Sequence, residues 1–338
     1  MNNKFTASEY RLFEQLVGLT QPALKKAMAN FLKKYYAGNI FETKEFIFCE
    51  GDIPIALVAH MDTVFSKPAS DVFYDSRKNV VWSPQGLGAD DRAGVFAILR
   101  IVQSGLRPHV ILTTDEEKGC VGADKLGQLQ RPFKDLRYMI ELDRRGVNDC
   151  VFYDCDNPDF TEYIETFGFV EAYGSFSDIC CLCESWETAG VNLSVGYKDE
   201  HSVSETLHVG HLLNTIEKVK VMLQQPTEEI PHFDFIPSQY SYAALLSGFE
   251  NIHSDYSGCG VTMRCRCCDR FYMWEELIPV MTKERFTEFR CSDCIVDGVK
   301  WCEECGNAYE STDENSTLCP VCEKENERWK KSKNNSKQ

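Results

Sequence analysis

The chain alternates short apolar runs with longer segments in which apolar residues recur at helical spacing. Strands are predicted over residues 45–50, 55–59, 110–112, 138–140 and 191–195. Helical spacing runs from Ala7 to Tyr36, from Asp91 to Ser104 and from Leu207 to Leu223. Because strands alternate with helices, the pattern predicts an α/β fold, a three-layer sandwich around a mostly parallel central sheet.

The pattern changes after residue 225, and it divides the chain into four regions. An α/β domain is predicted over residues 1–225 and a proline-interrupted connecting segment over 226–258. A small cysteine-rich domain follows over 259–325, and a polar tail over 326–338. Five apolar residues predict that the connecting segment packs against another part of the protein: Phe233, Phe235, Tyr240, Tyr242 and Leu245.

Composition narrows the classes of partner. The formal net charge of -16 argues against a general affinity for nucleic acid or anionic membranes. The first residues do not resemble a signal peptide, and no apolar run has the length needed to cross a bilayer. We therefore expect a cytoplasmic protein without a membrane partner.

Five short signatures rich in acidic residues or histidine occur along the first two thirds of the chain. They are His60–Asp62, Gly88–Gly94, Asp115–Glu117, Glu141–Asp143 and Glu200–Ser202. Three of them directly follow predicted buried strands, so their side chains should meet at one edge of the sheet. So many carboxylates would repel one another unless cations neutralised them. Imidazole together with carboxylate suits zinc or a similar transition metal, which predicts a two-metal hydrolase.

The residue types indicate how such a site could work. His60 leaves a strand and can bind one metal, while Asp62 faces the same way and can accept the other imidazole N–H. Asp90 lies at the start of a helix, where its two oxygens could bridge two metals. Asp143 and His201 would each complete one metal.

Two adjacent glutamates, Glu116 and Glu117, point in different directions after a strand. One can bind metal while the other remains free as a general base. Each signature alone has an ordinary explanation, such as a helix cap or a solvated turn. Their joint occurrence at strand ends and helix starts, in the order one site requires, favours the metal site.

The same residues resemble those of the co-catalytic two-zinc exopeptidases, which include zinc aminopeptidases, peptidase T, carboxypeptidases and amino-acid deacylases. The resemblance covers about residues 5–225 and rests on several motifs. These are H-x-D-x-V at His60–Val64, G-x-D-D-[KR]-x-G at Gly88–Gly94, D-E-E-x-G-x-x-G at Asp115–Gly122, and the closing S-D, G-[IV] and H-[ST]-x-x-E at Ser177–Asp178, Gly190–Val191 and His201–Glu205.

The resemblance implies a metallopeptidase with two catalytic divalent metals, zinc or else manganese or cobalt. It implies that Asp90 bridges the two metals, that His60 and Asp143 complete the first metal site, and that Glu117 and His201 complete the second. It also implies that Glu116 is the general base and that Asp62 orients His60. Only a short segment separates Asp143 from His201, which favours an aminopeptidase without a lid domain over a carboxypeptidase or an N-acyl amino acid deacylase. A non-catalytic binding protein acting through its zinc ribbons is the other alternative.

The chain departs from the family pattern at a few positions. Asn192 replaces the proline of the G-[IV]-P motif. Arg144 and Arg145 follow Asp143 and could attract a substrate carboxylate, although surface charges are the simpler interpretation. Tyr197 precedes His201 and is interpreted as a packing residue, with binding of the oxyanion as the alternative.

Ten of the 17 cysteines lie at or beyond Cys259. Eight of them form C-x-x-C pairs, enough for two structural zinc sites of four thiolates each. The pairs are Cys265/Cys268, Cys291/Cys294, Cys302/Cys305 and Cys319/Cys322. Sequential pairing would give two zinc ribbons, and a cross-braced arrangement is the alternative. Cys267 makes the first pair ambiguous.

Closed thiolate sites are structural, so the cysteine-rich domain should not be catalytic. We expect it to contact a protein partner. Covering the active-site mouth and self-association are alternatives. Nucleic-acid binding is disfavoured by acidic residues such as Glu303 and Glu304.

Overall fold

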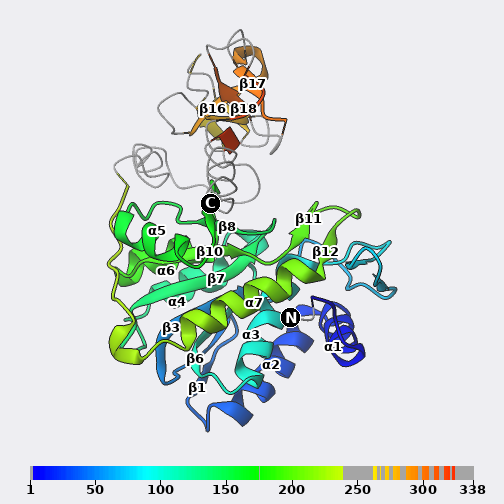
Figure 1. Ribbon diagram of the computed structural model, residues 1–338, viewed down its shortest axis with the longest axis vertical. Coiled ribbons are helices and arrows are strands. Elements are labelled where there is room, and N and C mark those ends of the chain that lie inside the picture. Colours follow the sequence, from blue (N-terminus) through cyan, green and yellow to red (C-terminus); the bar gives the residue numbers. More distant parts are fainter. Residues whose placement is uncertain are drawn as a thin grey trace, which may run out of the picture. The chain divides into compact units, whose positions relative to one another are not determined.

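The computed structural model describes residues 3–174 and 176–238, and within the cysteine-rich part residues 262–264, 267, 271–273, 277–281, 287–295, 299–303, 308–311, 316–319 and 322–323. The chain divides into two compact units, Met1–Ala244 and Leu245–Gln338 (Figure 1). Most of the predicted connecting segment, with Tyr240, Tyr242 and Leu245, lies outside the described residues, as does the predicted polar tail.

An eight-stranded sheet forms the centre of the first unit, in the order β1-β2-β6-β3-β7-β10-β8-β9. Its strands are β1 (Ile40–Glu42), β2 (Phe46–Cys49), β3 (Ile53–His60), β6 (Pro108–Thr113), β7 (Tyr138–Arg144), β8 (Asp149–Val151), β9 (Val170–Glu171) and β10 (Gly190–Ser194). The four middle strands, β6, β3, β7 and β10, pair in parallel. The predicted mostly parallel sheet is confirmed, while antiparallel pairing joins β1 to β2, β2 to β6 and β8 to β10.

Helices cover both faces of this sheet, which confirms the predicted three layers. One hydrophobic core contains α1 (Ala7–Val17), α2 (Gln21–Tyr35), α3 (Ala89–Gln103), α5 (Pro158–Glu165) and α7 (Val209–Leu223). A second core contains α4 (Val121–Gly127) and α6 (Asp178–Trp186). Figure 1 shows α3 and α7 crossing one face of the sheet.

A second sheet is absent from the prediction. It has the order β11-β12-β5-β4 and consists of β4 (Phe73–Asp75), β5 (Val80–Trp82), β11 (Tyr197–Lys198) and β12 (Thr206–His208). The predicted helix from Leu207 is therefore wrong in its first two residues, because Leu207 and His208 pair with Val81 and Val80. The helix begins at Val209, after His208 caps it through the hydrogen bond from His211 N to His208 Nδ1 (3.3 Å).

Local sequence explains how two of these helices are placed. Thr6 and Glu9 form a capping box at the start of α1, which satisfies two backbone N–H groups that the helix itself cannot pair. Gly94 lets α3 approach β7, because a Cβ atom there would lie 2.2 Å from the carbonyl oxygen of Leu142. Helix α3 begins at Ala89, two residues before the predicted start, and Asp90 and Asp91 have non-helical backbone angles within it.

The start of the predicted connecting segment packs on the first unit. Phe233 is buried in the main core and Phe235 contacts both cores. Asp234 forms an antiparallel bridge with Thr188, and Pro237 forms one with Cys155. Within the described part of the chain, no helix combines the length and apolar character needed to span a membrane.

The second unit contains short strands. Strands β13 (Thr262–Arg264) and β14 (Phe271–Met273) form an antiparallel pair. A four-stranded sheet has the order β16-β15-β18-β17, with β15 (Leu277–Met281), β16 (Thr287–Cys291), β17 (Val299–Trp301) and β18 (Ala308–Glu310).

Candidate metal centre

The strand ends bring three of the five signatures to one edge of the main sheet. His60 is the last residue of β3, and Asp143 lies near the end of β7. Glu116 and Glu117 begin a short 3-10 helix after β6. These strands are parallel neighbours, so their carboxyl ends meet where open α/β sheets place ligands.

His60 and two carboxylates form the first group of possible metal ligands. The His60 Nε2 atom lies 3.1 Å from Asp90 Oδ1 and 3.6 Å from Asp143 Oδ1. Its Nδ1 atom lies 3.2 Å from Asp62 Oδ1, the contact expected from the spacing of these two residues. One ligand atom from each of His60, Asp90 and Asp143 falls within 4.8 Å of the others.

The second group shares Asp90 with the first. His201 Nε2 lies 3.1 Å from Asp90 Oδ2 and 3.1 Å from Glu117 Oε2. The two oxygens of Asp90 therefore face two different histidines, one oxygen to each. The His60 side chain is 1% exposed, whereas the His201 side chain, in a turn with a backbone φ of 61°, is 54% exposed.

Glu116 is placed differently from Glu117. Its Oε1 atom accepts a hydrogen bond from the Cys120 thiol at 3.5 Å, whereas the Glu117 carboxylate faces His201. A third possible ligand group contains His60, Glu116 and Glu117, so geometry alone allows Glu116 to bind metal as well.

The electrostatics of the cluster call for positive charge. Burial and the charge of Asp90 raise the pKa of Asp143 to about 7, and burial raises the pKa of Glu116 to about 8. Burial alone would lower the pKa of His60, but Asp143, Asp62 and Asp90 raise it well above its usual value. Asp143 and Glu116 thus resist ionisation while the His60 imidazole resists losing its proton, as expected where anionic groups crowd together.

An unsatisfied oxygen fits a metal in the second group. Hydrogen bonds with Asp90 and Glu117 raise the pKa of His201 to about 11. The other oxygen of Glu117, Oε1, is buried without a hydrogen-bond partner. Buried oxygens normally have partners, and divalent cations commonly bind carboxylate oxygens together with imidazole nitrogen. The residues present therefore suit divalent metal ions.

Comparison with known proteins agrees with this chemistry. Residues 49–166 match the model of Peptidase family M28. This match identifies the protein as a metallopeptidase, a metal-dependent hydrolase whose class of substrate is peptides.

Solved structures share the fold. A tripeptidase from Staphylococcus aureus subsp. aureus Mu50 is 14% identical with a TM-score of 0.52, over 65% of this chain and 98% of that one. A TET aminopeptidase from a marine sediment archaeon of the Thaumarchaeota is 11% identical with a TM-score of 0.51, over 66% of this chain and 99% of that one. A search of curated proteins found no match.

Asp143 of this peptidase is held by neighbours that sequence reasoning missed. The side chain of Asn192 accepts a hydrogen bond from Asp143 N (2.9 Å) and donates one to Asp143 O (2.8 Å). The Tyr197 hydroxyl donates to Asp143 Oδ1 at 3.0 Å, and Ser177 Oγ lies 3.3 Å from Oδ2. In the sequence, Asn192 stands out only as a departure from a proline, and the interpretation of Tyr197 as a packing residue misses its hydroxyl contact.

Other polar residues of the expected motifs also lie close to the site. Asp178 accepts a hydrogen bond from the Thr113 hydroxyl at the end of β6. Arg145 forms an ion pair with Glu200 (2.8 Å), and Arg144 donates to the carbonyl of Tyr173 (2.8 Å). Both arginines therefore have partners within the protein.

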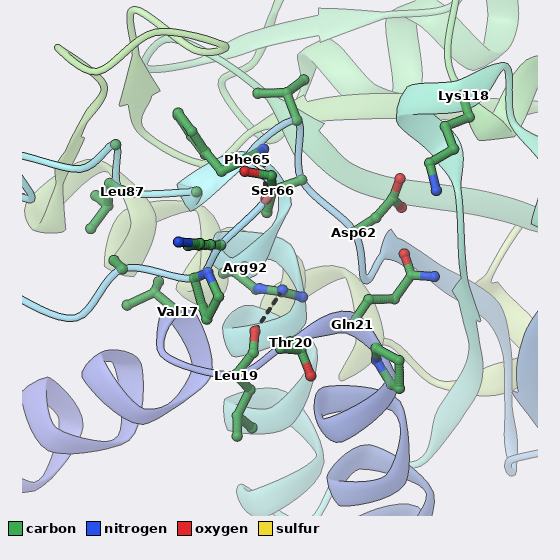
Figure 2. Close-up of a pocket in the computed structure, with 18 residues that line it drawn as sticks. Val17, Leu19, Thr20, Gln21, Asp62, Phe65, Ser66, Leu87, Arg92 and Lys118 are labelled. Carbon is green, nitrogen blue, oxygen red and sulfur yellow. Dashed lines mark hydrogen bonds between the residues drawn. The ribbon is translucent and has the colours of Figure 1, made fainter.

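A cavity of about 340 Å³ adjoins the site beside Asp62. It lies between the connection from α1 to α2 and the loops around residues 62–69 and 86–88. Figure 2 shows Asp62 and Lys118 on one side of the cavity and Leu87 on the other. The buried Arg92 lies between them and donates a hydrogen bond to the carbonyl oxygen of Leu19 at 3.0 Å. This bond ties the connection between α1 and α2 to helix α3.

In the second unit, three of the predicted zinc ligands gather. The sulfur atoms of Cys302, Cys319 and Cys322 lie within 4.8 Å of one another, and all three residues are buried. Their grouping joins the third and fourth C-x-x-C pairs. Cys291 precedes the short 3-10 helix Ser292–Cys294 after β16, and Cys294 is its last residue, while Cys265, Cys268 and Cys305 lie outside the described residues.

Proposed function

We propose that this peptidase is an aminopeptidase that uses two divalent metal ions, with zinc as the expected metal. His60, Asp90 and Asp143 would hold one ion, and Asp90, Glu117 and His201 the other. The observation that carries the proposal is the position of Asp90, whose two oxygens each lie 3.1 Å from a different histidine nitrogen. A carboxylate placed in this way suits two ions a short distance apart.

Glu116 would act as the general base. When bound, the ions supply Lewis-acid polarisation of the scissile carbonyl and make a water acidic enough to lose a proton near neutral pH. Glu116 would accept that proton and pass it to the leaving amine. This role is supported by the contrast with Glu117, whose Oε2 atom faces His201 while Glu116 contacts the Cys120 thiol.

Two observations favour an aminopeptidase over a deacylase or a carboxypeptidase. The described residues between Asp143 and His201 contribute β8, α5, β9, α6 and β10 to the main unit, and they form no separate lid domain. In addition, the structural neighbours named above are a tripeptidase and an aminopeptidase. The cavity beside Asp62 would receive a substrate residue next to the scissile bond.

The test combines metal analysis of the full-length protein with a substrate panel of free-amine peptides, N-acetylated peptides and N-acyl amino acids. We expect hydrolysis of the free-amine peptides only. Glu116→Gln should lower kcat by about 100-fold or more, as loss of a general base does, while the metal content stays unchanged. The exposed Glu228 supplies the matched control Glu228→Gln, which should retain full activity.

Each other outcome contradicts a specific part of the proposal. Hydrolysis restricted to N-acyl substrates would make the protein a deacylase. Retained turnover by Glu116→Gln would remove its role as base, and loss of a metal ion from that variant would make Glu116 a ligand instead.

For the second unit we propose sequential pairing of the cysteines into two structural zinc sites. Cys302 and Cys305 would pair with Cys319 and Cys322, and Cys265 and Cys268 with Cys291 and Cys294. The grouping of Cys302 with Cys319 and Cys322 supports this arrangement, because cross-bracing would separate them. Among the described residues, Tyr309 and Leu318 pack against the three thiols.

A further inference from the structure

Glu205 is a buried carboxylate to which no step of the proposed reaction assigns a role. Its side chain is 1% exposed. One oxygen accepts a hydrogen bond from Gly88 N at 2.6 Å, and the other accepts one from Asp90 N at 2.9 Å. The backbone of Ala89, between them, also contributes a hydrogen bond. Glu205 therefore holds the backbone of the turn that carries Asp90.

This turn begins α3, and it needs such an acceptor. The first N–H groups of a helix have no partner within the helix, and the positive end of the helix dipole favours an anion there. Gly88 adopts a left-handed conformation with φ of 66°, and a Cβ atom there would approach Thr63 Cγ2 at 3.1 Å. With no side-chain cap at Gly88 itself, the anion comes from a distant part of the chain.

Glu205 also links the two halves of the centre. It lies four residues after His201, in the loop that leads into β12. Its contacts tie this loop to the Asp90 turn, and His201, in the same loop, faces Asp90 Oδ2 at 3.1 Å. A change at Glu205 would move Asp90 relative to both histidines.

We propose that Glu205 is a positioning residue that sets the orientation of Asp90 between two metal ions. The inference rests on the proposed function, because it takes Asp90 to be the shared ligand. Since a shared ligand serves both ions, loss of Glu205 should weaken both binding sites together. Groups that support ligands commonly change metal affinity by about 10- to 100-fold.

Tyr197 provides the comparison that separates this role from general destabilisation. Its hydroxyl donates to Asp143 Oδ1, and Asp143 belongs only to the His60 side of the centre. Like Glu205 it is buried, at 3% exposed. Tyr197→Phe should therefore weaken one site and leave the other unchanged.

The experiment titrates the chelator-treated, full-length protein with Co²⁺ by calorimetry and by near-ultraviolet and visible absorption. Thiolate sites are recognised by their sulfur-to-cobalt charge-transfer bands, which sites of nitrogen and oxygen ligands lack, so the cysteine sites can be counted separately. The variants are Glu205→Gln, Tyr197→Phe and, as an exposed control, Glu228→Gln. Glu205→Gln keeps one acceptor oxygen, but its amide nitrogen faces a backbone N–H. We expect about 10- to 100-fold weaker Co²⁺ binding at both nitrogen–oxygen sites for Glu205→Gln, and at one site for Tyr197→Phe.

Three outcomes would overturn the inference. Glu205→Gln could keep the Co²⁺ affinities of both nitrogen–oxygen sites. If the thermal midpoint of the metal-free protein were also lowered, Glu205 would have a purely structural role. It could weaken only one site, which would mean that Asp90 is not shared through this turn. Tyr197→Phe could weaken both sites equally, which would mean that any buried change loosens the centre. By contrast, wild-type protein with fewer than two nitrogen–oxygen sites would refute the proposed function itself.

Discussion

Replacing Asp62 by asparagine tests how the centre is held. Asp62 is 5% exposed and accepts three hydrogen bonds. Its Oδ1 atom accepts hydrogen bonds from His60 Nδ1 at 3.2 Å and from Glu116 N at 3.0 Å, and its Oδ2 atom accepts one from Glu117 N at 3.2 Å. One carboxylate thus orients the histidine of the first proposed ion, the proposed base and a ligand of the second ion.

The size of the effect follows from these contacts. An asparagine side chain at this position would keep one acceptor oxygen, and its amide nitrogen would face a backbone or imidazole N–H. Asp62→Asn therefore loses at least one hydrogen bond to a charged group, worth about 1.5–3 kcal/mol. Expressed as metal affinity, about 1.4 kcal/mol corresponds to a tenfold change, so we expect weakening by about 10- to 100-fold.

The assay is competition for zinc against a chelator of known affinity, together with kcat/KM measured at low and at saturating zinc. We expect Asp62→Asn to lose most activity at low zinc and to recover part of it at saturation, because the ligands themselves remain. Asp159→Asn, at an exposed position in the first turn of α5, is the matched control. Zinc affinity within twofold of wild type would refute the reasoning, since the imidazole would then need no carboxylate to orient it.

Three further predictions concern metal exchange, pH and the second unit. The ion beside His201 should exchange with added metal faster than the ion beside His60, because the His201 side chain is 54% exposed and the His60 side chain 1%; isotope exchange with ⁶⁷Zn²⁺ would show two unequal rates. His109 should stabilise the fold only in its neutral form. Its Nδ1 atom accepts a hydrogen bond from Gly51 N (3.0 Å), which a protonated Nδ1 could not do, and its Nε2 atom donates one to Asp135 O (2.7 Å). Burial lowers the pKa of His109, so its contribution is present above the ordinary value of 6.5 and is lost as the pH falls below it; urea unfolding of wild type should lose more stability with acid than unfolding of His109→Leu does. Cys319→Ser should remove one structural zinc from the full-length protein and leave peptide hydrolysis by the M28 domain unchanged, which metal counting and kinetics on the same sample would check; loss of both ribbon zincs at once would instead favour cross-bracing.

The candidate metal ligands could be picked out from the sequence because their chemistry restricts both their type and their place. A histidine or carboxylate directly after an apolar run, as at His60, must emerge at the end of a buried strand. Parallel neighbours then bring such ends together without any knowledge of the exact register. The N-terminal helices and the middle strands were predictable for the same reason, since their apolar spacing extends over many residues.

The strands of the second sheet could not be anticipated, because they are only two or three residues long. Thr206–His208 lies between a loop and a helix, and its three residues carry too little pattern to distinguish a strand from the first turn of the helix. What makes it a strand is its pairing with Val80–Trp82, more than a hundred residues away. Sequence spacing contains no information about such a partner.

The residues that support the ligands escaped prediction for a related reason, and they show what kind of information was missing. Asn192 reaches the backbone of Asp143 because β10 pairs with β7 in the register that places Asn192 beside Glu141. A shift of one residue would turn its amide to the other face of the sheet. Glu205 belongs to a motif that the sequence displays, yet its function depends on a turn 115 positions earlier in the chain. The type of a candidate ligand is restricted by metal chemistry, so it can be recognised from a short stretch of sequence. The residues that support each ligand are set by strand register and loop closure. A structure is therefore needed more for finding the supporting residues than for finding the ligands.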